Sequence, residues 1–564
     1  MKHIHNNDSS APTSSSTVRT SLRRLLALEG KTPPESPGPL DLAAWLALRF
    51  GFLPKPISFE ANGDDLVIRH PSETESAKAK AAELLNRAIK RADQGDYEAT
   101  ARLCRRALEK QPSLHGARRE LAHACVELRD LAQAKAVLLQ VVWCDPDDTW
   151  GLIALGNLSL GEGDHERAER FTTLALALDP GSAEALVNLG LIYKATGRTG
   201  QAFEALHQSI AIDPAWPNAH CALARLLADQ GKFEESAAAI HRLFGSAKHQ
   251  DEQSGRIFES ARRCYATCQK ELAQRGYQAA MRTVSELQAQ TEKLTGCPIR
   301  ISYRETRGIL SGSGVTRATD YDPGNGVLQC QLEGPEYARP HLEASTLLRF
   351  QADWEAGRRG KRRGIVITPD QLNGLVSLFG LLPGPLSPEV RGQLNAVAAQ
   401  MALVPMYTLQ GSAPNMLTEI TLRQRFPELR PAQFMSLSEG FIENWQARQI
   451  LKGRQRHRLP RLLDRTISAL SWLEALFLDH LFGGVTDLAA VCREDEGFDL
   501  ARKLWQHWQS KSGSMDVGDE FAILEDFADM LGLSGRFNWV ASPFPDQRPQ
   551  DLTCHQSGPG PEPI

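Results

Sequence analysis

One stretch of the sequence, PHLEASTLLRFQADWEAG at 340–357, brings a histidine and a carboxylate close together in a pattern that predicts a helix. Imidazole and carboxylate side chains bind transition-metal ions and transfer protons, so His341 and Glu343 are candidates for chemistry. Two residues along an α-helix subtend ~200°, however, so these side chains point to nearly opposite faces. They cannot chelate one ion while the segment is helical, and a metal site would need another ligand.

The residues around His341 resemble the H-E-x-x-H helix of zinc peptidases, with two of the three defining positions changed. In that motif two histidines four residues apart bind zinc, and the glutamate beside the first histidine is the general base. Here Leu342 stands at the base position and Ser345 at the position of the second histidine. An ordinary amphipathic helix is the alternative, with these side chains facing the core: Leu347, Phe350 and Trp354.

A later stretch, NMLTEITLRQRFPELRPAQFMSL at 415–437, adds to the same resemblance. It is similar to a segment of H-E-x-x-H proteins that also carry repeats, in which a glutamate precedes the run that reads FPELRPAQFMSL here. That glutamate is Glu419, so His341 and Glu419 are the remnant metal candidates. Zinc sites need three or four protein ligands. We therefore expect no catalytic residue and no cofactor, and zinc at an atypical site is the alternative.

The segments around this helix predict a C-terminal domain. In PIRISY (298–303) and GVLQCQL (326–332), apolar and polar residues alternate or β-branched residues follow one another, and glycine turns lie beside them, which predicts strands. Beyond these segments the chain is predicted to be mostly helical. We expect an α+β, mostly helical, peptidase-like and inactive domain over 297–542. A flexible tail is expected at 543–564, which is rich in proline, glycine and glutamine.

The strongest pattern in the sequence is a repeat of 34 residues. Small residues recur 24 and 12 positions before each of a series of equally spaced prolines. The prolines are Pro112, Pro146, Pro180 and Pro214, and the small residues are Ala88, Ala122, Gly156 and Gly190, then Thr100, Ala134, Ala168 and Ala202. Two antiparallel helices pack closely only where small side chains let their backbones approach, and proline ends a helix because it lacks the N–H. The period predicts stacked helix pairs.

This pattern resembles the tetratricopeptide repeat, whose period and spacing it matches. The segment LVNLGLIYKATGRTGQAFEALHQSIAIDP (186–214) shows it in full. The resemblance implies about five repeats over 81–250, stacked as a right-handed α-solenoid with a concave groove that binds peptide segments or helices of a partner protein. The predicted fold class is mainly α, with this solenoid followed by the α+β domain.

The first helix of each repeat is expected to line the groove. The predicted lining residues are Arg119, His123, Trp150, Ile153, Asn157, Val187, Asn188, Lys194, Asn218 and Arg225. Some tetratricopeptide proteins clamp a C-terminal carboxylate with two asparagines flanked by basic residues, and Asn157 and Asn188 match those asparagines. Ile153, Asn218 and Ala222 occupy the basic positions, so binding of a chaperone tail is not implied. A solvated face without a ligand is the alternative.

Other segments flank the repeats. Residues 1–38 are rich in Ser, Thr, Pro and Asn, which predicts a disordered tail. Residues 39–80 predict a small accessory segment beside the first repeat, with a short apolar helix at 39–54 and an extended piece at 67–70. Residues 251–296 predict a helical connector to the C-terminal domain.

Composition and charge restrict the possible functions further. The chain has 64 basic and 68 acidic residues and a net charge of −4, so no global positive excess favours nucleic acid or an anionic membrane. No apolar run approaches the ~18 residues that span a bilayer, and the N-terminus lacks the apolar core of a secretory signal. The ten cysteines include no C-x-x-C pair, which favours a reduced, cytoplasmic protein.

Three functional hypotheses follow. The first, which we favour, is a non-enzymatic adaptor or scaffold that binds protein partners in the repeat groove and keeps an inactive peptidase-like domain. The second is a zinc-dependent hydrolase with an atypical site at His341 and Glu419. The third is association with nucleic acid through two basic runs, RRGKRR (358–363) and KGRQRHRLPR (452–461), which solvated loops explain better. The oligomeric state stays open.

Overall fold

The structure is a computed structural model that describes residues 17–30, 39–53, 55, 57–62, 64–70, 73–246, 252–303, 318–322, 327–332, 334–381, 388–454, 460–492, 497–513 and 515–541. The tail expected at 543–564 lies outside these residues, as do 1–16 and 31–38 of the expected N-terminal tail. The chain divides into two compact units, residues 1–231 with 246–261 and residues 232–245 with 262–564. None of the described helices is both long and apolar enough to cross a membrane.

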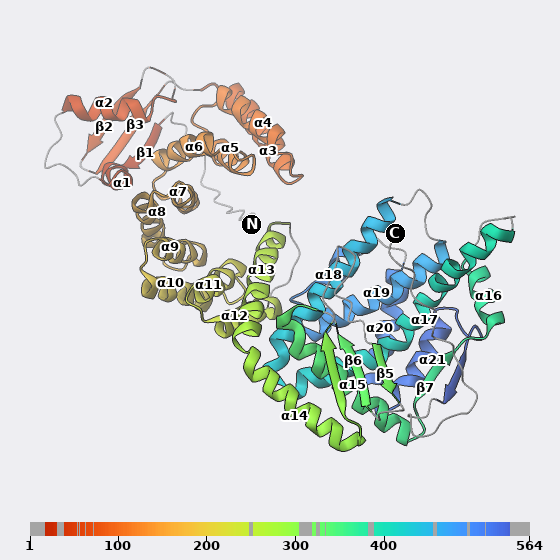
Figure 1. The fold of residues 1–564 in the computed structure, drawn as a ribbon. Helices are drawn as coiled ribbons and strands as arrows, with labels where there is room; N and C mark the ends of the chain where they lie inside the picture. The colour runs from red at the N-terminus through yellow and green to blue at the C-terminus, as the bar shows by residue number, and fades with distance from the viewer. Residues whose placement is uncertain are drawn as a thin grey trace. The chain divides into compact units, whose positions relative to one another are not determined.

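Helix pairs make up most of the first unit and follow the predicted period (Figure 1). They are α3 (Glu75–Ala92) and α4 (Tyr97–Lys110), α5 (His115–Glu127) and α6 (Leu131–Cys144), α7 (Thr149–Gly161) and α8 (His165–Leu178), and α9 (Ala183–Ala195) and α10 (Thr199–Ile212). α11 (Pro217–Asp229) begins the fifth repeat. Each of the four equally spaced prolines stands two residues beyond the end of a second helix, as predicted.

The small residues of the repeat lie where the paired helices touch. Ala88, Ala122, Ala168 and Ala202 have no exposed surface. A Cβ atom on Gly190 would lie 2.8 Å from Leu206 Cγ of the partner helix, closer than side-chain atoms normally pack. The prediction that small side chains let the helix backbones approach is therefore confirmed.

A small module precedes the repeats. Its antiparallel sheet has the order β1–β3–β2, and Ile68 of the central strand pairs with Val18 on one side and Phe59 on the other. The elements are β1 (Thr17–Ser21), α1 (Leu22–Leu28), α2 (Pro39–Arg49), β2 (Ser58–Asn62) and β3 (Asp65–Arg69). The expectation of a disordered tail is wrong for residues 17–30, because β1 completes the sheet and α1 buries Leu25 and Leu28.

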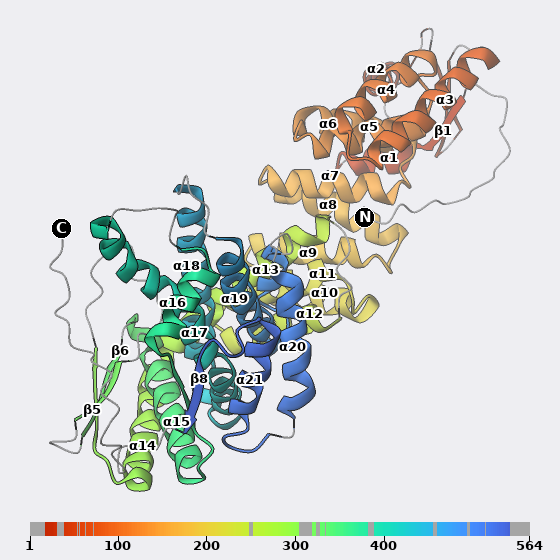
Figure 2. The same cartoon turned by 90° about the vertical axis from the view of Figure 1, so that its right-hand side faces the viewer.

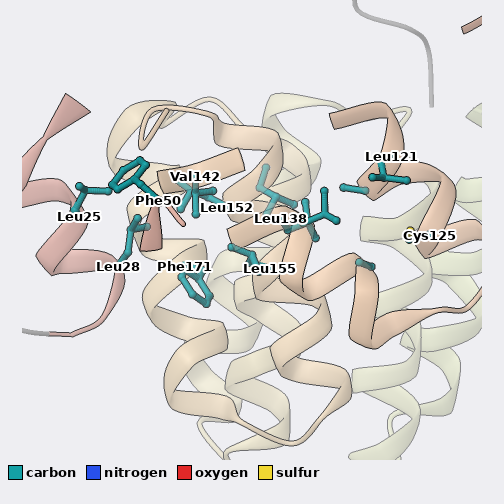
Figure 3. Close-up of a cluster of buried hydrophobic side chains, with 14 of the residues drawn as sticks. Leu25, Leu28, Phe50, Leu121, Cys125, Leu138, Val142, Leu152, Leu155 and Phe171 are labelled. Carbon is teal, nitrogen blue, oxygen red and sulfur yellow. The ribbon is translucent and has the colours of Figure 1, made fainter. Parts of the chain in front are cut away.

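The module packs on the second and third repeats, not beside the first as expected. Phe50 and Leu25 belong to one buried cluster with Val142, Leu152 and Phe171 of α6, α7 and α8 (Figure 3). The buried Arg118 guanidinium of α5 also lies 4.3 Å from the centre of the Phe52 ring. These repeats offer an apolar surface to the module, which explains its position.

The second unit is mostly helical. Its helices are α12 (Phe233–Ser246), α13 (Glu252–Arg275, shared with the first unit), α14 (Tyr277–Thr295), α15 (Arg339–Arg358), α16 (Pro369–Leu378), α17 (Pro388–Arg425), α18 (Arg430–Arg454), α19 (Arg461–Leu481), α20 (Phe498–Ser512) and α21 (Glu520–Met530), with 3-10 turns η1 (Glu336–Ala338), η2 (Pro427–Leu429) and η3 (Leu488–Cys492). Its strands are β4 (Ile299–Tyr303), β5 (Ala318–Asp322), β6 (Val327–Leu332), β7 (Arg363–Val366) and β8 (Asn538–Ala541). The helical connector forms two helices that meet at Gly276.

The helix α15 is the central element of this unit. β6 pairs with β4 in parallel and with β5 antiparallel, and the sheet packs with α14 against α15 (Figure 2). Every residue from Pro340 to Leu348 is buried, so the first half of α15 has no solvent-facing side. Leu347 and Phe350 face the core, as the alternative of an ordinary amphipathic helix expected. The first half of α15 is not amphipathic, however, because α14, α17 and α18 also contact the helix.

Candidate functional sites

The residues predicted to line the groove all lie on first helices, α5, α7, α9 and α11, and we call them the first-helix face. Arg119, Asn157 and Arg225 are exposed, and four are partly buried: His123, Trp150, Lys194 and Asn218. Ile153, Val187 and Asn188 are buried. Ile153 and Val187 thus contribute to the apolar core between helices rather than offering a free surface, which differs from the prediction.

Neighbouring first helices bring several of these residues together. The Arg119 guanidinium lies 5.2 Å from the centre of the Trp150 ring, and its Nε is 3.3 Å from Asp148 Oδ2. Lys194 Nζ of α9 lies 2.5 Å from Asp229 Oδ2 of α11. Positive charge on this face is therefore partly neutralised by acidic neighbours, and the face is not a uniformly basic surface.

Asn188 differs from the other residues of the first-helix face. Its side chain is only 6% exposed, and its Nδ2 is buried without a hydrogen-bond partner. Leaving a buried polar group unpaired costs about 1–3 kcal/mol. The Asn188 amide is therefore an unsatisfied polar group beneath the first-helix face, where the surrounding protein keeps its N–H out of reach of a ligand.

In the described part of the chain, a metal-like cluster lies where the start of α5 meets the loop before α7. His115, Asp145 and Asp148 place possible ligand atoms within 4.8 Å of one another. Asp148 Oδ2 already accepts from His115 Nε2 at 3.0 Å and pairs with Arg119, while Oδ1 caps α7 by accepting from Gly151 N at 2.8 Å. Burial alone would raise the pKa of Asp148, but these donors outweigh it and lower that pKa. Asp148 is thus accounted for as the cap of α7, with His115 and Arg119 as its partners.

A second polar site lies inside the second unit, where α15, α17 and α18 meet. We call His341, Ser345, Glu419 and Gln433 the polar cluster. His341 Nε2 is 2.8 Å from Glu419 Oε2, and Ser345 Oγ donates to Glu419 Oε1 at 2.8 Å. Gln433 Nε2 donates to Glu419 Oε2 at 2.9 Å and to the Glu419 carbonyl at 2.8 Å. All these side chains are buried.

The electrostatics of the polar cluster favour an ionised carboxylate. Burial pushes the pKa of Glu419 upward, but the His341 charge and the hydrogen bonds from His341, Gln433 and Ser345 outweigh it and lower the pKa to about 2. A buried carboxylate that accepts several hydrogen bonds is held in its charged form in this way.

Glu343 belongs to a different contact. Tyr303 Oη of β4 donates to Glu343 Oε1 at 2.6 Å, and the Arg339 guanidinium lies 4.6 Å from the centre of the Tyr303 ring. Burial raises the pKa of the Glu343 carboxyl. His341 and Glu343 thus face different neighbours, as the ~200° between their positions on the helix requires.

The donors of the polar cluster do not fit zinc. His341 and Glu419 are brought together, but the third position holds the neutral Ser345 hydroxyl, and zinc takes three or four Cys, His or carboxylate ligands. Leu342, at the base position, packs in an apolar cluster with Leu332 and Ala338. Histidines that bind metal donate their other N–H to a neighbour. The buried Nδ1 of His341 has no such partner in the described structure.

Gln433 was not predicted as part of a site. It lies in the run FPELRPAQFMSL, in the first turn of α18 and just after the 3-10 turn η2, and nothing in its residue type sets it apart. The signal that points to it is its place in the run that resembles H-E-x-x-H proteins, 14 residues after Glu419.

Comparison with known proteins agrees with the repeat pattern. Models of the tetratricopeptide repeat match residues 91–155 and 183–215. The array is a tetratricopeptide-repeat solenoid. A comparison with curated proteins found no match.

Solved tetratricopeptide proteins align with about a third of the chain. TTC0263 of Thermus thermophilus, a thermophilic TPR protein, shares 22% identity over 32% of this chain and 98% of its own, with a TM-score of 0.29. The MamA protein shares 20% identity over 30% of this chain and 91% of its own, with a TM-score of 0.27. YrrB, described as a TPR protein with an unusual peptide-binding site, shares 16% identity over 32% of this chain and 92% of its own, with a TM-score of 0.26. The repeat assignment rests on the family matches and the period.

Outside the tetratricopeptide array, the basic run 358–363 makes ion pairs within the second unit. Arg359 Nη1 lies 2.6 Å from Asp516 Oδ2, and Lys361 Nζ lies 2.8 Å from Asp519 Oδ1. Gly518 approaches so closely that a Cβ on it would lie 2.5 Å from Lys361 Cβ. These contacts give the run a structural role. Half of the second run 452–461, residues 455–459, lies outside the described residues.

Proposed function

We propose that this chain is a non-enzymatic adaptor that holds an extended segment of a partner protein on the first-helix face. The observation that carries the proposal is the group of polar side chains exposed on that face, Arg119, Asn157 and Arg225. A main-chain carbonyl of a bound peptide would accept from the Asn157 amide or from either guanidinium.

The chemistry of the face favours peptide main chain over a free carboxylate. Ile153 and Ala222, at two positions where a carboxylate clamp has basic residues, are buried and uncharged. Lys194 is paired with Asp229. Trp150 adds a partly exposed aromatic surface, the kind of side chain that anchors partners at interfaces.

The test is recovery of partners by the full-length tagged chain from its native cells, with proteins identified by mass spectrometry. Combining Asn157→Ala, Asn188→Ala and Trp150→Ala is expected to remove a defined set of partners. The matched control is Gln201→Ala with Gln208→Ala, which removes two exposed amides from the second helix α10. Retention of every partner by the first variant, or equal loss in the control, would contradict the proposal.

The second unit is proposed to act as a non-catalytic binding or structural domain, and the protein is proposed to work in the reducing cytoplasm. The hydrolase hypothesis requires stoichiometric zinc that His341→Ala removes, which metal analysis of the purified chain measures. Nucleic-acid association requires binding that weakens steeply as salt rises.

A further inference from the structure

The polar cluster has the layout of a metal site with one ligand missing. Residues four apart on a helix share a face, and His341 and Ser345 of α15 both use that face to reach one carboxylate. The carboxylate comes from a separate helix, α17, which is how a third ligand completes a site begun by two helical residues. Of these three side chains, only Ser345 is a weak ligand for a transition metal, because its hydroxyl group is neutral.

We infer that the side-chain carboxyl group of Glu419, held by His341, Ser345 and Gln433, replaces a metal ion as the link between α15, α17 and α18, and that position 345 is the missing ligand. Hydrogen bonds satisfy both oxygens of Glu419, so the three helices are connected without an ion. A thiolate or imidazole at position 345 would be the third metal ligand, beside His341 and Glu419.

The surroundings separate metal binding from catalysis. Leu342 is 2% exposed and packs with Leu332 and Ala338, so no carboxylate stands where a base would activate bound water. Completing the ligand set therefore creates a metal site and no hydrolase.

The experiment substitutes Ser345 in the full-length chain. Ser345→Cys keeps the side-chain volume nearly unchanged, and Ser345→His supplies a second imidazole. The purified proteins are loaded with Zn²⁺ or Co²⁺, dialysed and analysed for bound metal, and the cobalt form of Ser345→Cys is examined for thiolate-to-cobalt absorption. Ser438→Cys is the matched control, because Ser438 is also buried, on α18, and donates to the Phe434 carbonyl instead of Glu419.

The wild-type chain and Ser438→Cys are expected to retain no stoichiometric metal. Ser345→Cys or Ser345→His is expected to retain one ion per chain, and adding His341→Ala should abolish it. A variant that folds only when loaded with metal also supports the inference, because metal binding then supplies folding free energy.

Several results would overturn it. A stoichiometric ion in the wild type that His341→Ala removes would show that the site is already complete. Folded Ser345→Cys and Ser345→His proteins that take no metal, or variants that stay unfolded with metal, would show that the geometry is wrong. Equal binding by Ser438→Cys would assign the metal to any buried thiol.

Discussion

The tetratricopeptide array and the polar cluster join helices in two different ways. In the array, each pair of helices meets through a small residue such as Ala168 or Ala202, and the same contact recurs every 34 residues. In the polar cluster, His341 and Glu419 are 78 residues apart and meet once. A repeated contact produces a recurring pattern in the sequence, whereas a contact that is made once produces no such pattern.

The two regions also differ in what a substitution removes. The array depends on close apolar packing spread over many helix pairs, so one change affects one interface. The polar cluster concentrates a buried charge and its donors at one point between three helices, and losing the carboxylate leaves the buried His341 without its charged partner.

The largest effect is therefore expected from Glu419→Ala. It leaves His341 Nε2 buried without its carboxylate partner, and removing one partner of a buried ion pair costs about 3–5 kcal/mol. Hydrogen exchange of the amides in α15 and α17 measures the lost stability. Glu525→Ala, an exposed carboxylate on α21, should change it by less than about 0.5 kcal/mol. Equal protection in both variants would contradict a role for the cluster in joining the helices.

Acid should weaken the same contact. The pKa of Glu419 is lowered from 4.5 to about 2 in the folded chain, so its contribution to stability is fully present above about pH 5. It is lost as the pH falls toward 2, and the shift corresponds to roughly 3 kcal/mol. The difference in unfolding free energy between the wild type and Glu419→Gln, measured by urea titration from pH 6 to pH 2, should shrink by that amount. A difference that does not change with pH would contradict the assignment.

Much of the fold could be predicted from the sequence where contacts are local or repeated. The helix pairs, their small residues and the strands β4 and β6 were predicted, because period and alternation report directly on packing. The position of the accessory module was not, because nothing in residues 39–80 indicates which repeat offers the complementary apolar surface.

The candidate sites show the same limit. The sequence pointed to His341 and Glu419 through a resemblance, but the hydrogen bonds that join them depend on how three separate helices pack. The helix α17 also runs through Pro405 and Pro414, where local rules predict a break. Buried Ile153 and Val187 were expected on the free face because helix periodicity alone does not show how closely the next helix packs.

A smaller effect is expected where the array is tightly packed. Gly190→Ala forces a methyl group within 2.8 Å of Leu206 Cγ and should destabilise the chain by about 1–2 kcal/mol in urea unfolding. Gly200→Ala is the matched control, because nothing lies within 4 Å of the position that its methyl group would take. Alanine also favours the helix, so the control should gain up to about 1 kcal/mol. If both substitutions changed the free energy of unfolding in the same direction, the close-packing explanation would be contradicted.

The smallest effect concerns the turn inside the second repeat. Arg129 has a φ of 61°, whereas the equivalent turns carry glycine, with φ of 74° at Gly95 and 78° at Gly163. A side chain costs about 1–2 kcal/mol in this left-handed region, and the greater freedom of glycine in the unfolded chain offsets part of that. Arg129→Gly should therefore stabilise the chain by about 0.5–1 kcal/mol in urea unfolding. Gly163→Ala makes the reverse change one repeat later, where nothing lies within 4 Å of a Cβ, so it should destabilise by a similar amount. If both substitutions shift stability in the same direction, backbone strain does not distinguish these turns.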